Sequence, residues 1–198
     1  MTSASAWLLR FAHLLKPGAS VLDVACGSGR NLRWLVERGH AVTGIDRDAA
    51  AVEPLRTLAE IVVADIEADP WPLRGRRFDA VLVANYLWRP LWPTLLEAVA
   101  DGGLYLHETF AHGQQFIGKP SRPDFLLQPG ELLQACAGLQ TVAYENGFES
   151  GLETASDSTF DPGGAGRHVQ RIVSIKALGP GGEPRRLMLK SAQLNFGN

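Results

Sequence analysis

Short apolar runs recur along the chain, and each is followed by glycine or by polar residues. Runs of this kind are typical of strands that are buried on both faces of a parallel sheet. They occupy residues 21–25, 40–46, 61–67, 78–88, 104–110, 139–145 and 169–178. Apolar residues at helical spacing occur in residues 3–16, 31–38, 48–58, 90–99 and 129–136. This alternation predicts an α/β protein with a doubly wound, mostly parallel seven-stranded sheet and helices on both faces.

The first apolar run leads directly into a glycine loop. Val21 to Ala25 is followed by Cys26, then by Gly27-Ser28-Gly29, and then by the helical pattern at 31–38. A strand, a glycine loop and a helix start in this order place backbone N–H groups against a ligand. Glycine would let the ligand approach the backbone closely, because it carries no Cβ. The loop therefore predicts a binding site.

The residues around this loop narrow the kind of ligand. A dinucleotide fingerprint would have a third glycine where this chain has Leu32. Asp23, four residues before Gly27, offers a carboxylate to a cationic group instead. The motif from Leu22 to Gly29 (Leu-Asp-Val-Ala-Cys-Gly-Ser-Gly) resembles the first motif of class I S-adenosylmethionine (SAM)-dependent methyltransferases.

This resemblance extends over about residues 19–110 by the order and spacing of elements. It implies the fold of that class, in which the last strand is antiparallel. It also implies SAM as cofactor and an enzyme that transfers a methyl group in-line to an acceptor. A nicotinamide-dependent oxidoreductase and a SAM-binding module without catalysis are the alternatives.

Two further strand patterns end in acids that suit a nucleoside. Asp46 can accept both hydroxyl hydrogens of a ribose, and Asp48 is the better cap for the next helix, which predicts that Asp46 is free. At Asp65 the resemblance implies acceptance from the adenine amino group, with Ile66 covering the ring; a solvated loop acid is the alternative. The expected cofactor-binding residues are Asp23, Ala25, Gly27, Gly29, Asn31, Asp46, Arg47, Asp65, Ile66 and Asn85.

The acceptor is expected beyond the fourth and fifth strands, because ligands of open α/β sheets bind at the carboxyl ends of strands. Residues at these two ends are Tyr86, Trp88, Arg89, His107, Glu108 and Thr109. Three of them are candidate catalytic residues. Tyr86 offers a flat surface to an aromatic or cationic acceptor, and His107 has a pKa suited to a general base. Glu108 would serve only if burial raised its pKa. The structural alternative pairs Glu108 with Arg89 and makes His107 a core residue.

Residues 111–130 form a long, irregular connection, which is typical of a lid or substrate loop. Its apolar residues predict that much of it is buried: Phe116, Ile117, Phe125, Leu126 and Leu127. The chain, residues 1–198, is thus expected to be one Rossmann-like methyltransferase domain with this lid. A mobile hairpin loop is predicted at 147–167, and Leu187-Met188-Leu189 is a candidate edge strand in the tail 179–198.

Composition excludes several function classes. The chain has 19 Lys and Arg against 21 Asp and Glu, and this balance does not suit a protein that coats nucleic acid or a membrane surface. Cys26 and Cys136 make neither a disulfide framework nor a metal site, so no metal is expected and a cytoplasmic location is predicted. No run reaches the roughly 18 apolar residues of a membrane span.

Two classes of acceptor fit the sequence. A small molecule is favoured by the acidic balance, the compact length and the apolar lid, and the layout is similar to methyltransferases of the tellurite-resistance and ubiquinone-biosynthesis types. A nucleic-acid base is the alternative. Asn85-Tyr86-Leu87-Trp88 lies where amino-group methyltransferases have Asn-Pro-Pro-aromatic, although both prolines are missing. The oligomeric state is left open.

Overall fold

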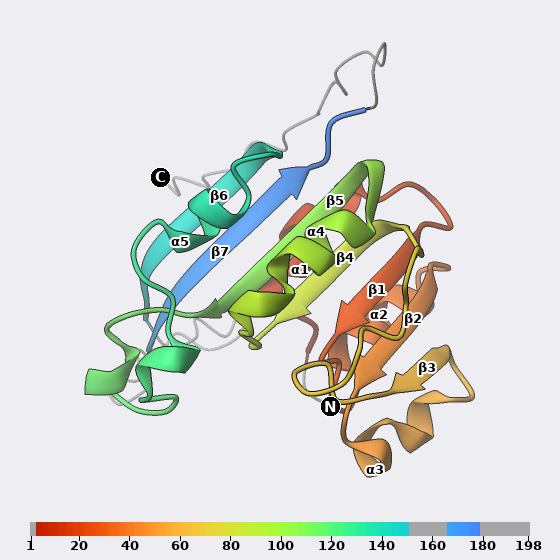
Figure 1. Ribbon diagram of the computed structural model, residues 1–198, viewed down its shortest axis with the longest axis horizontal. Coiled ribbons are helices and arrows are strands. Elements are labelled where there is room, and N and C mark those ends of the chain that lie inside the picture. The colour runs from red at the N-terminus through yellow and green to blue at the C-terminus, as the bar shows by residue number, and fades with distance from the viewer. Residues whose placement is uncertain (1–2, 151–165, 179–198) are drawn as a thin grey trace, which may run out of the picture.

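The computed structural model describes residues 3–150 and 166–178, and its centre is a seven-stranded sheet (Figure 1). The strands are β1 (Ser20–Val24), β2 (Ala41–Asp46), β3 (Glu60–Val63), β4 (Phe78–Ala84), β5 (Val99–Phe110), β6 (Gln140–Glu149) and β7 (Arg167–Ile175). Their order is β3-β2-β1-β4-β5-β7-β6. The pairs from β3 to β5 are parallel, and β7 is antiparallel to both β5 and β6. This confirms the predicted doubly wound sheet with its antiparallel last strand.

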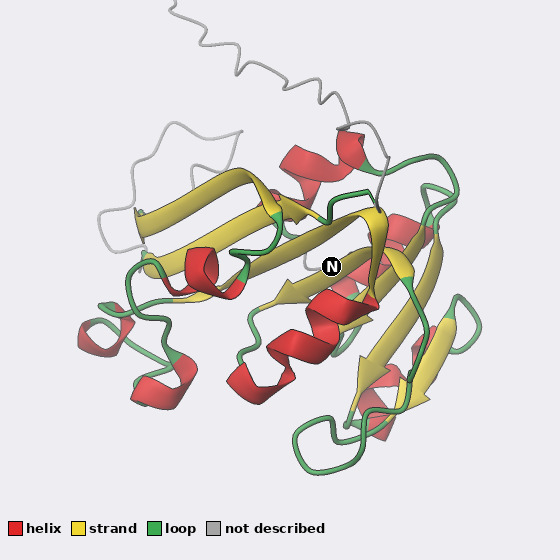
Figure 2. Ribbon diagram, turned by 45° about the horizontal axis from the view of Figure 1, so that its top comes forward, coloured by secondary structure: helices red, strands yellow, loops and turns green. Residues whose placement is uncertain are grey.

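Two apolar cores lie on opposite faces of the sheet, because successive side chains of a strand point to opposite sides. On β1, Val21 belongs to one core and Leu22 to the other, which explains the unbroken apolar runs. The first core is covered by α1 (Ala6–Phe11), α2 (Arg30–Val36) and α3 (Ala49–Val52), and the second by α4 (Trp92–Ala98) and α5 (Glu131–Ala135). Figure 2 shows helices on both sides of the sheet.

Several helices are shorter than their apolar patterns predict. The expected helix 48–58 ends at Val52 and continues as the 3₁₀ turn η2 (Glu53–Leu55). Pro54 accounts for the change, since it has no N–H to donate within a helix. The expected helix 3–16 likewise divides into α1 and η1 (Ala12–Leu14).

The ends of the strands also differ from prediction, and these differences shape the site. β3 stops at Val63, because the Asp65 carboxylate accepts the N–H of Glu67 at 3.0 Å and closes a turn. β4 stops at Ala84, because Asn85 has a φ of +58°, in the left-handed region. In contrast, β5 begins five residues before the expected strand, directly after α4.

The N-terminal segment is hydrogen-bonded to β7, which comes late in the sequence. The indole N–H of Trp7 donates to the carbonyl of Ile172 on β7 at 3.1 Å, and the N–H of Ser5 donates to Asn31 Oδ1 at 2.9 Å. Trp7 is almost completely buried. These contacts hold α1 against the sheet beside α2.

Two predicted features fall on residues that the structure does not describe. Most of the predicted loop 147–167 lies outside the described residues, and so does the candidate edge strand Leu187-Met188-Leu189. Within the described ranges, no helix has both the length and the apolar character that crossing a membrane requires.

Candidate active site

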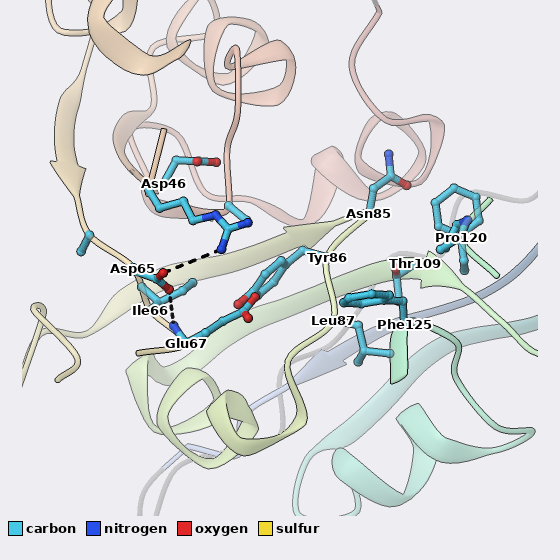
Figure 3. A pocket seen from close by; sticks show the side chains of 14 residues that line it. Asp46, Asp65, Ile66, Glu67, Asn85, Tyr86, Leu87, Thr109, Pro120 and Phe125 are labelled. Carbon is cyan, nitrogen blue, oxygen red and sulfur yellow. Dashed lines mark hydrogen bonds and ion pairs between the residues drawn. The ribbon is translucent and has the colours of Figure 1, made fainter. Parts of the chain in front are cut away.

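A pocket of about 440 Å³ lies at the carboxyl ends of the parallel strands (Figure 3). Its lining residues are Ala25, Asp46, Arg47, Ala64, Asp65, Ile66, Glu67, Asn85, Tyr86, Leu87, Thr109, Phe110, Pro120 and Phe125. The size is that of a small-molecule site. The place is the one at which open α/β sheets bind ligands, because the loops beyond the strands diverge there.

Asp46 lines this pocket, but it is not free. Its Oδ2 accepts the N–H of Gly27 at 2.8 Å, and its Oδ1 accepts the N–H of Asp48 at 2.9 Å. Asp48 caps α3 as predicted, by accepting from Ala50 and Ala51 at 3.0 Å. The prediction that the cap leaves Asp46 unbonded is therefore wrong. A carboxylate has about four lone-pair sites, so Asp46 still has acceptor capacity for a ligand.

The next acid along the pocket wall is Asp65, with Ile66 and Glu67 beside it. Its Oδ2 lies 3.7 Å from Nη1 of Arg47, and its Oδ1 accepts the N–H of Glu67 (Figure 3). Both expected adenine-site residues, Asp65 and Ile66, thus line the pocket together with Asp46. Sequence reasoning missed Glu67, although it directly follows this pair.

The glycine loop supports the pocket more than it lines it. Of the residues expected to bind the cofactor, Ala25 beside this loop and Asn85 after β4 line the wall, and both have positive φ, +52° and +58°. A Cβ on Gly29 would lie 2.6 Å from the Leu55 side chain, and its φ is +78°. Gly29 is therefore required for turn geometry and packing. Asn31 is buried and bonded to the N-terminal segment.

Asp23 is buried beneath the loop with an unused acceptor. It is 2% exposed, and its Oδ2 has no hydrogen-bond partner. Burial raises the pKa of Asp23 to about 7; the N–H of Leu32 and the charge of Arg30 oppose the rise, and Asp46 adds to it. A buried acceptor of this kind fits a cationic ligand group.

Tyr86 lies in the pocket, but toward the end with Ile66 and Glu67. Figure 3 shows its ring directed at Glu67 and away from Thr109 and Phe125. Its hydroxyl is buried on the side of Glu67. Burial raises the pKa of Tyr86, and the negative charge of Glu67 raises it further. The structure thus groups Tyr86 with the acids expected to hold the nucleoside.

The structure does not bring His107 into the pocket. It is 1% exposed, its Nε2 donates to the carbonyl of Tyr86 at 3.0 Å, and its Nδ1 lies 2.9 Å from the Tyr105 hydroxyl. Burial lowers the pKa of His107 to about 4. His107 is therefore a satisfied core histidine, as in the structural alternative, and it is not available as a general base.

Glu108 is also buried and does not line the pocket. Its Oε2 accepts from Nε of Arg171 at 3.2 Å, and its Oε1 lies 3.9 Å from Nη2 of Arg30. The expected pair between Glu108 and Arg89 is therefore wrong. Glu108 and Arg171 are opposite one another on β5 and β7, so the strand register brings them together.

Arg89 instead fastens the loop 111–130. It begins η3 (Arg89–Leu91), and its guanidinium donates to the carbonyls of Asp124 at 2.7 Å and Leu126 at 2.9 Å. It also donates to both carboxylate oxygens of Glu131. The loop carries the short turns η4 (Gln114–Phe116) and η5 (Pro123–Phe125).

This loop contributes Pro120 and Phe125 to the pocket, next to Leu87, Thr109 and Phe110. Among its apolar residues, Leu126 and Leu127 are buried as expected, whereas Phe116 is 78% exposed and Ile117 46%. The prediction that Phe116 and Ile117 need burial is wrong. The sequence marked the loop as a lid but could not show which of its residues reach the pocket.

Comparisons with known proteins agree with this fold. Residues 21–102 match a family model described as a methyltransferase domain. TehB from Haemophilus influenzae superposes with a TM-score of 0.70 at 19% identity, over 89% of this chain and 63% of that one, so the chain spans less than two thirds of TehB. No curated protein sequence matches the chain.

Two further solved structures are similar over most of their length. A SAM-dependent methyltransferase from Methanosarcina mazei superposes with a TM-score of 0.66 at 16% identity, over 89% of this chain and 100% of that one. One from Archaeoglobus fulgidus does so with a TM-score of 0.65 at 18% identity, over 85% and 91%. Identities this low establish the fold, while the family match covers the glycine loop and the acids at 46 and 65. Taken with the sheet order, these findings show that the chain has the class I methyltransferase fold and that residues 21–102 are similar to a methyltransferase domain.

Proposed function

We propose that this enzyme methylates a small molecule, and that the molecule binds beneath the loop 111–130. The main support is that Pro120 and Phe125 of this loop line the same pocket as Asp46 and Asp65. A ligand held by the two acids therefore lies in one continuous space with the loop residues. Closure of this loop over the pocket would exclude water from a small acceptor, which is useful in group transfer.

The charge of the pocket supports a small molecule over a nucleic acid. Three acids line it, Asp46, Asp65 and Glu67, whereas Arg47 is the one basic residue in its described lining and faces Asp65. Affinity for nucleic acid comes largely from lysine and arginine contacts to phosphates. The same acids suit the positively charged donor.

The acceptor end of the pocket contains no acid or base among its described residues. Leu87, Thr109, Phe110, Pro120 and Phe125 form it. SAM supplies a methyl group already activated on a sulfonium, so these residues have to align the acceptor and keep water out. We therefore expect an acceptor whose nucleophilic atom has a free lone pair at neutral pH, such as a thiolate or an unprotonated amine.

The test is a screen in which S-adenosylhomocysteine (SAH) release is measured with panels of small thiols, amines and phenols, and with structured RNA and duplex DNA. We expect turnover with a small molecule, and a pH profile that follows the pKa of that acceptor. Methyl incorporation into nucleic acid, with none into the small-molecule panels, would overturn the proposal. A nucleic-acid substrate would also give a steep salt dependence.

Binding of SAM or SAH is expected to release a proton from Asp23. The pKa of Asp23 is raised to about 7 in the free protein, mainly by burial, whereas a bound ammonium favours its charged form. Affinity should therefore rise with pH and level off above 7, with a deficit of roughly tenfold at pH 6. Titration calorimetry in two buffers of different ionisation enthalpy measures the proton.

The Asp23→Asn variant is the control for this linkage. It should bind SAH more weakly and release no proton between pH 6 and 8. The stability of the free protein should change with pH in the opposite direction to its affinity for SAH. Between about pH 4 and 7, Asp23 is protonated in the folded protein but ionised in the unfolded chain. Its contribution to stability therefore declines as the pH rises through this range. Proton release that persists in Asp23→Asn would assign the linkage to another group.

Replacing Arg89 with methionine is expected to loosen the loop 111–130 without weakening donor binding. The change removes hydrogen bonds to two loop carbonyls and to Glu131. Chymotrypsin should cut at the exposed Phe116 at least about tenfold faster, because cleavage follows the population of the open loop. The acceptor KM should rise, and SAH affinity should stay within about twofold.

The control is Arg77→Met, since Arg77 lies outside this loop and pairs with Glu97, and both side chains are substantially exposed. It should leave both cleavage and KM unchanged. Equal cleavage in Arg89→Met and the parent protein would show that Arg89 does not hold the loop.

A further inference from the structure

One hydroxyl at the acceptor end of the pocket has no partner. Thr109 is 3% exposed, and Figure 3 places it at the opposite end of the pocket from Asp65. Within residues 3–150 and 166–178, nothing bonds to the Thr109 hydroxyl, and it is not among the side-chain oxygens sealed from solvent. The four other residues of this end have apolar side chains: Leu87, Phe110, Pro120 and Phe125.

The strand register leaves this hydroxyl to a ligand. Thr109 is four residues from Tyr105 on β5, so its side chain lies on the face of the sheet that holds the second core. Its cross-strand neighbour on β7 is Gln170. The amide oxygen of Gln170 accepts the N–H of Leu132 at 2.7 Å, and its amide nitrogen donates to the carbonyl of Gln128 at 2.9 Å. Buried polar groups nearly always have a partner, so Thr109 indicates a ligand group that meets it.

The charge of the pocket disfavours a thiolate as the nucleophile. Three acids line it, Asp46, Asp65 and Glu67, with Arg47 as the one base in its described lining. SAM, with two positive groups and one negative, does not balance these acids, so an anion that enters the pocket is repelled.

An aliphatic amine does not fit either. It is protonated at neutral pH and has no free lone pair, and none of the described residues of the acceptor end is a base that could deprotonate it. The nucleophile that fits is a neutral nitrogen whose lone pair is free at neutral pH. An amine attached to an aromatic ring has this property, because it is only weakly basic.

The residues of the acceptor end suit an amine of this kind. Phe110 and Phe125 line it with aromatic rings, which match a flat apolar body. The Thr109 oxygen can accept one N–H of the amine, which leaves the lone pair free to face the donor methyl. We propose that the acceptor is a primary aromatic amine, and that Thr109 orients its nitrogen for attack. This inference rests on the proposed function and names the acceptor class of the same pocket.

The transfer itself needs no acid or base from the protein. The nitrogen lone pair forms the bond to the methyl carbon while the bond from that carbon to sulfur breaks, and the electron pair of the broken bond stays on sulfur. SAH is released, and the methylated nitrogen carries the positive charge until it gives a proton to water. Because Thr109 aligns the acceptor and does not touch the donor in this scheme, its loss should affect turnover and not SAH binding.

The test measures SAH release with aniline and its ring-substituted derivatives, beside aliphatic amines and thiols of similar size. We expect turnover with the aromatic amines. Thr109→Val keeps the shape of the side chain without its hydroxyl, and should lower kcat/KM for these amines about tenfold or more, mainly through kcat. Thr109→Ser keeps the hydroxyl and should stay within about threefold of the parent protein. Calorimetry should give the same SAH affinity in both variants.

Thr141→Val is the matched control, because Thr141 is an exposed threonine on β6 and does not line the pocket. It should leave turnover and SAH affinity unchanged, and urea unfolding verifies the fold of each variant. Parent-like turnover in Thr109→Val, or equal losses in Thr109→Val and Thr109→Ser, would overturn the role of Thr109. Methylation of thiols or aliphatic amines but not of aromatic amines would overturn the acceptor class and leave the proposed function intact. Methylation of nucleic acid alone would overturn the proposed function, and this inference with it.

Discussion

Replacing Asp46 with alanine is expected to weaken SAH binding by roughly 30- to 1000-fold, which corresponds to about 2–4 kcal/mol. The carboxylate is expected to accept the two ribose hydroxyls, and both of these charge-assisted bonds are lost. The structure adds a second reason. Asp46 also holds the N–H groups of Gly27 and Asp48, so its loss frees the loop that supports the ligand.

Calorimetry on the folded variant measures this effect, and Asp48→Ala is its control. Asp48 lies two residues away and caps α3 through Ala50 and Ala51. Its removal should cost about 1 kcal/mol of stability and leave donor affinity nearly unchanged. Parent-like affinity in a folded Asp46→Ala protein would rule out the ribose assignment.

Replacing Arg171 with methionine is expected to destabilise the protein by about 3–5 kcal/mol, because it leaves a buried charge without its partner. The Arg171 side chain is 9% exposed and contacts Glu108, Glu145 and Glu149. Glu108 would remain buried with only the more distant Arg30. Burial acts to raise the pKa of Glu149, but hydrogen bonds from Arg171 and Arg167 outweigh it and hold that pKa below its usual range.

Urea unfolding of Arg171→Met gives the free energy, and Arg77→Met gives the comparison. Arg77 pairs with Glu97 at 2.9 Å, but both side chains are substantially exposed. An exposed pair of this kind contributes about 0–1 kcal/mol. If the two variants lose equal stability, burial is not what makes Arg171 important.

The fold could be predicted because its signals are local. Apolar runs mark β1 to β5, and the cap at Asp48 follows from residues next to it in sequence. The same holds for the pocket acids, since carboxyl ends of parallel strands meet at one edge and this brings Asp46 and Asp65 together. Ala25 and Asn85 could be predicted as residues of the site for the same reason, because each follows the end of a parallel strand.

The partners of polar side chains could not be predicted, because they depend on strand register and on loops that return from far along the chain. Glu108 meets Arg171, which is 63 residues away, and Arg89 meets Glu131, which is 42 residues away. Tyr86 illustrates a different limit. The left-handed Asn85 ends β4 at Ala84, four residues before the expected end of the strand at residue 88, so strand alternation no longer describes where Tyr86 points.

The position of β7 has a consequence for synthesis on the ribosome. β7 is the last described strand in sequence, yet it lies between β5 and β6. Until residues 167–175 have emerged, a nascent chain offers β5 with an unpaired edge and β6 with no neighbour, and Trp7 lacks the carbonyl that it binds. Unpaired edges invite association between chains. The seven-stranded sheet can therefore be completed only after β7 has been translated.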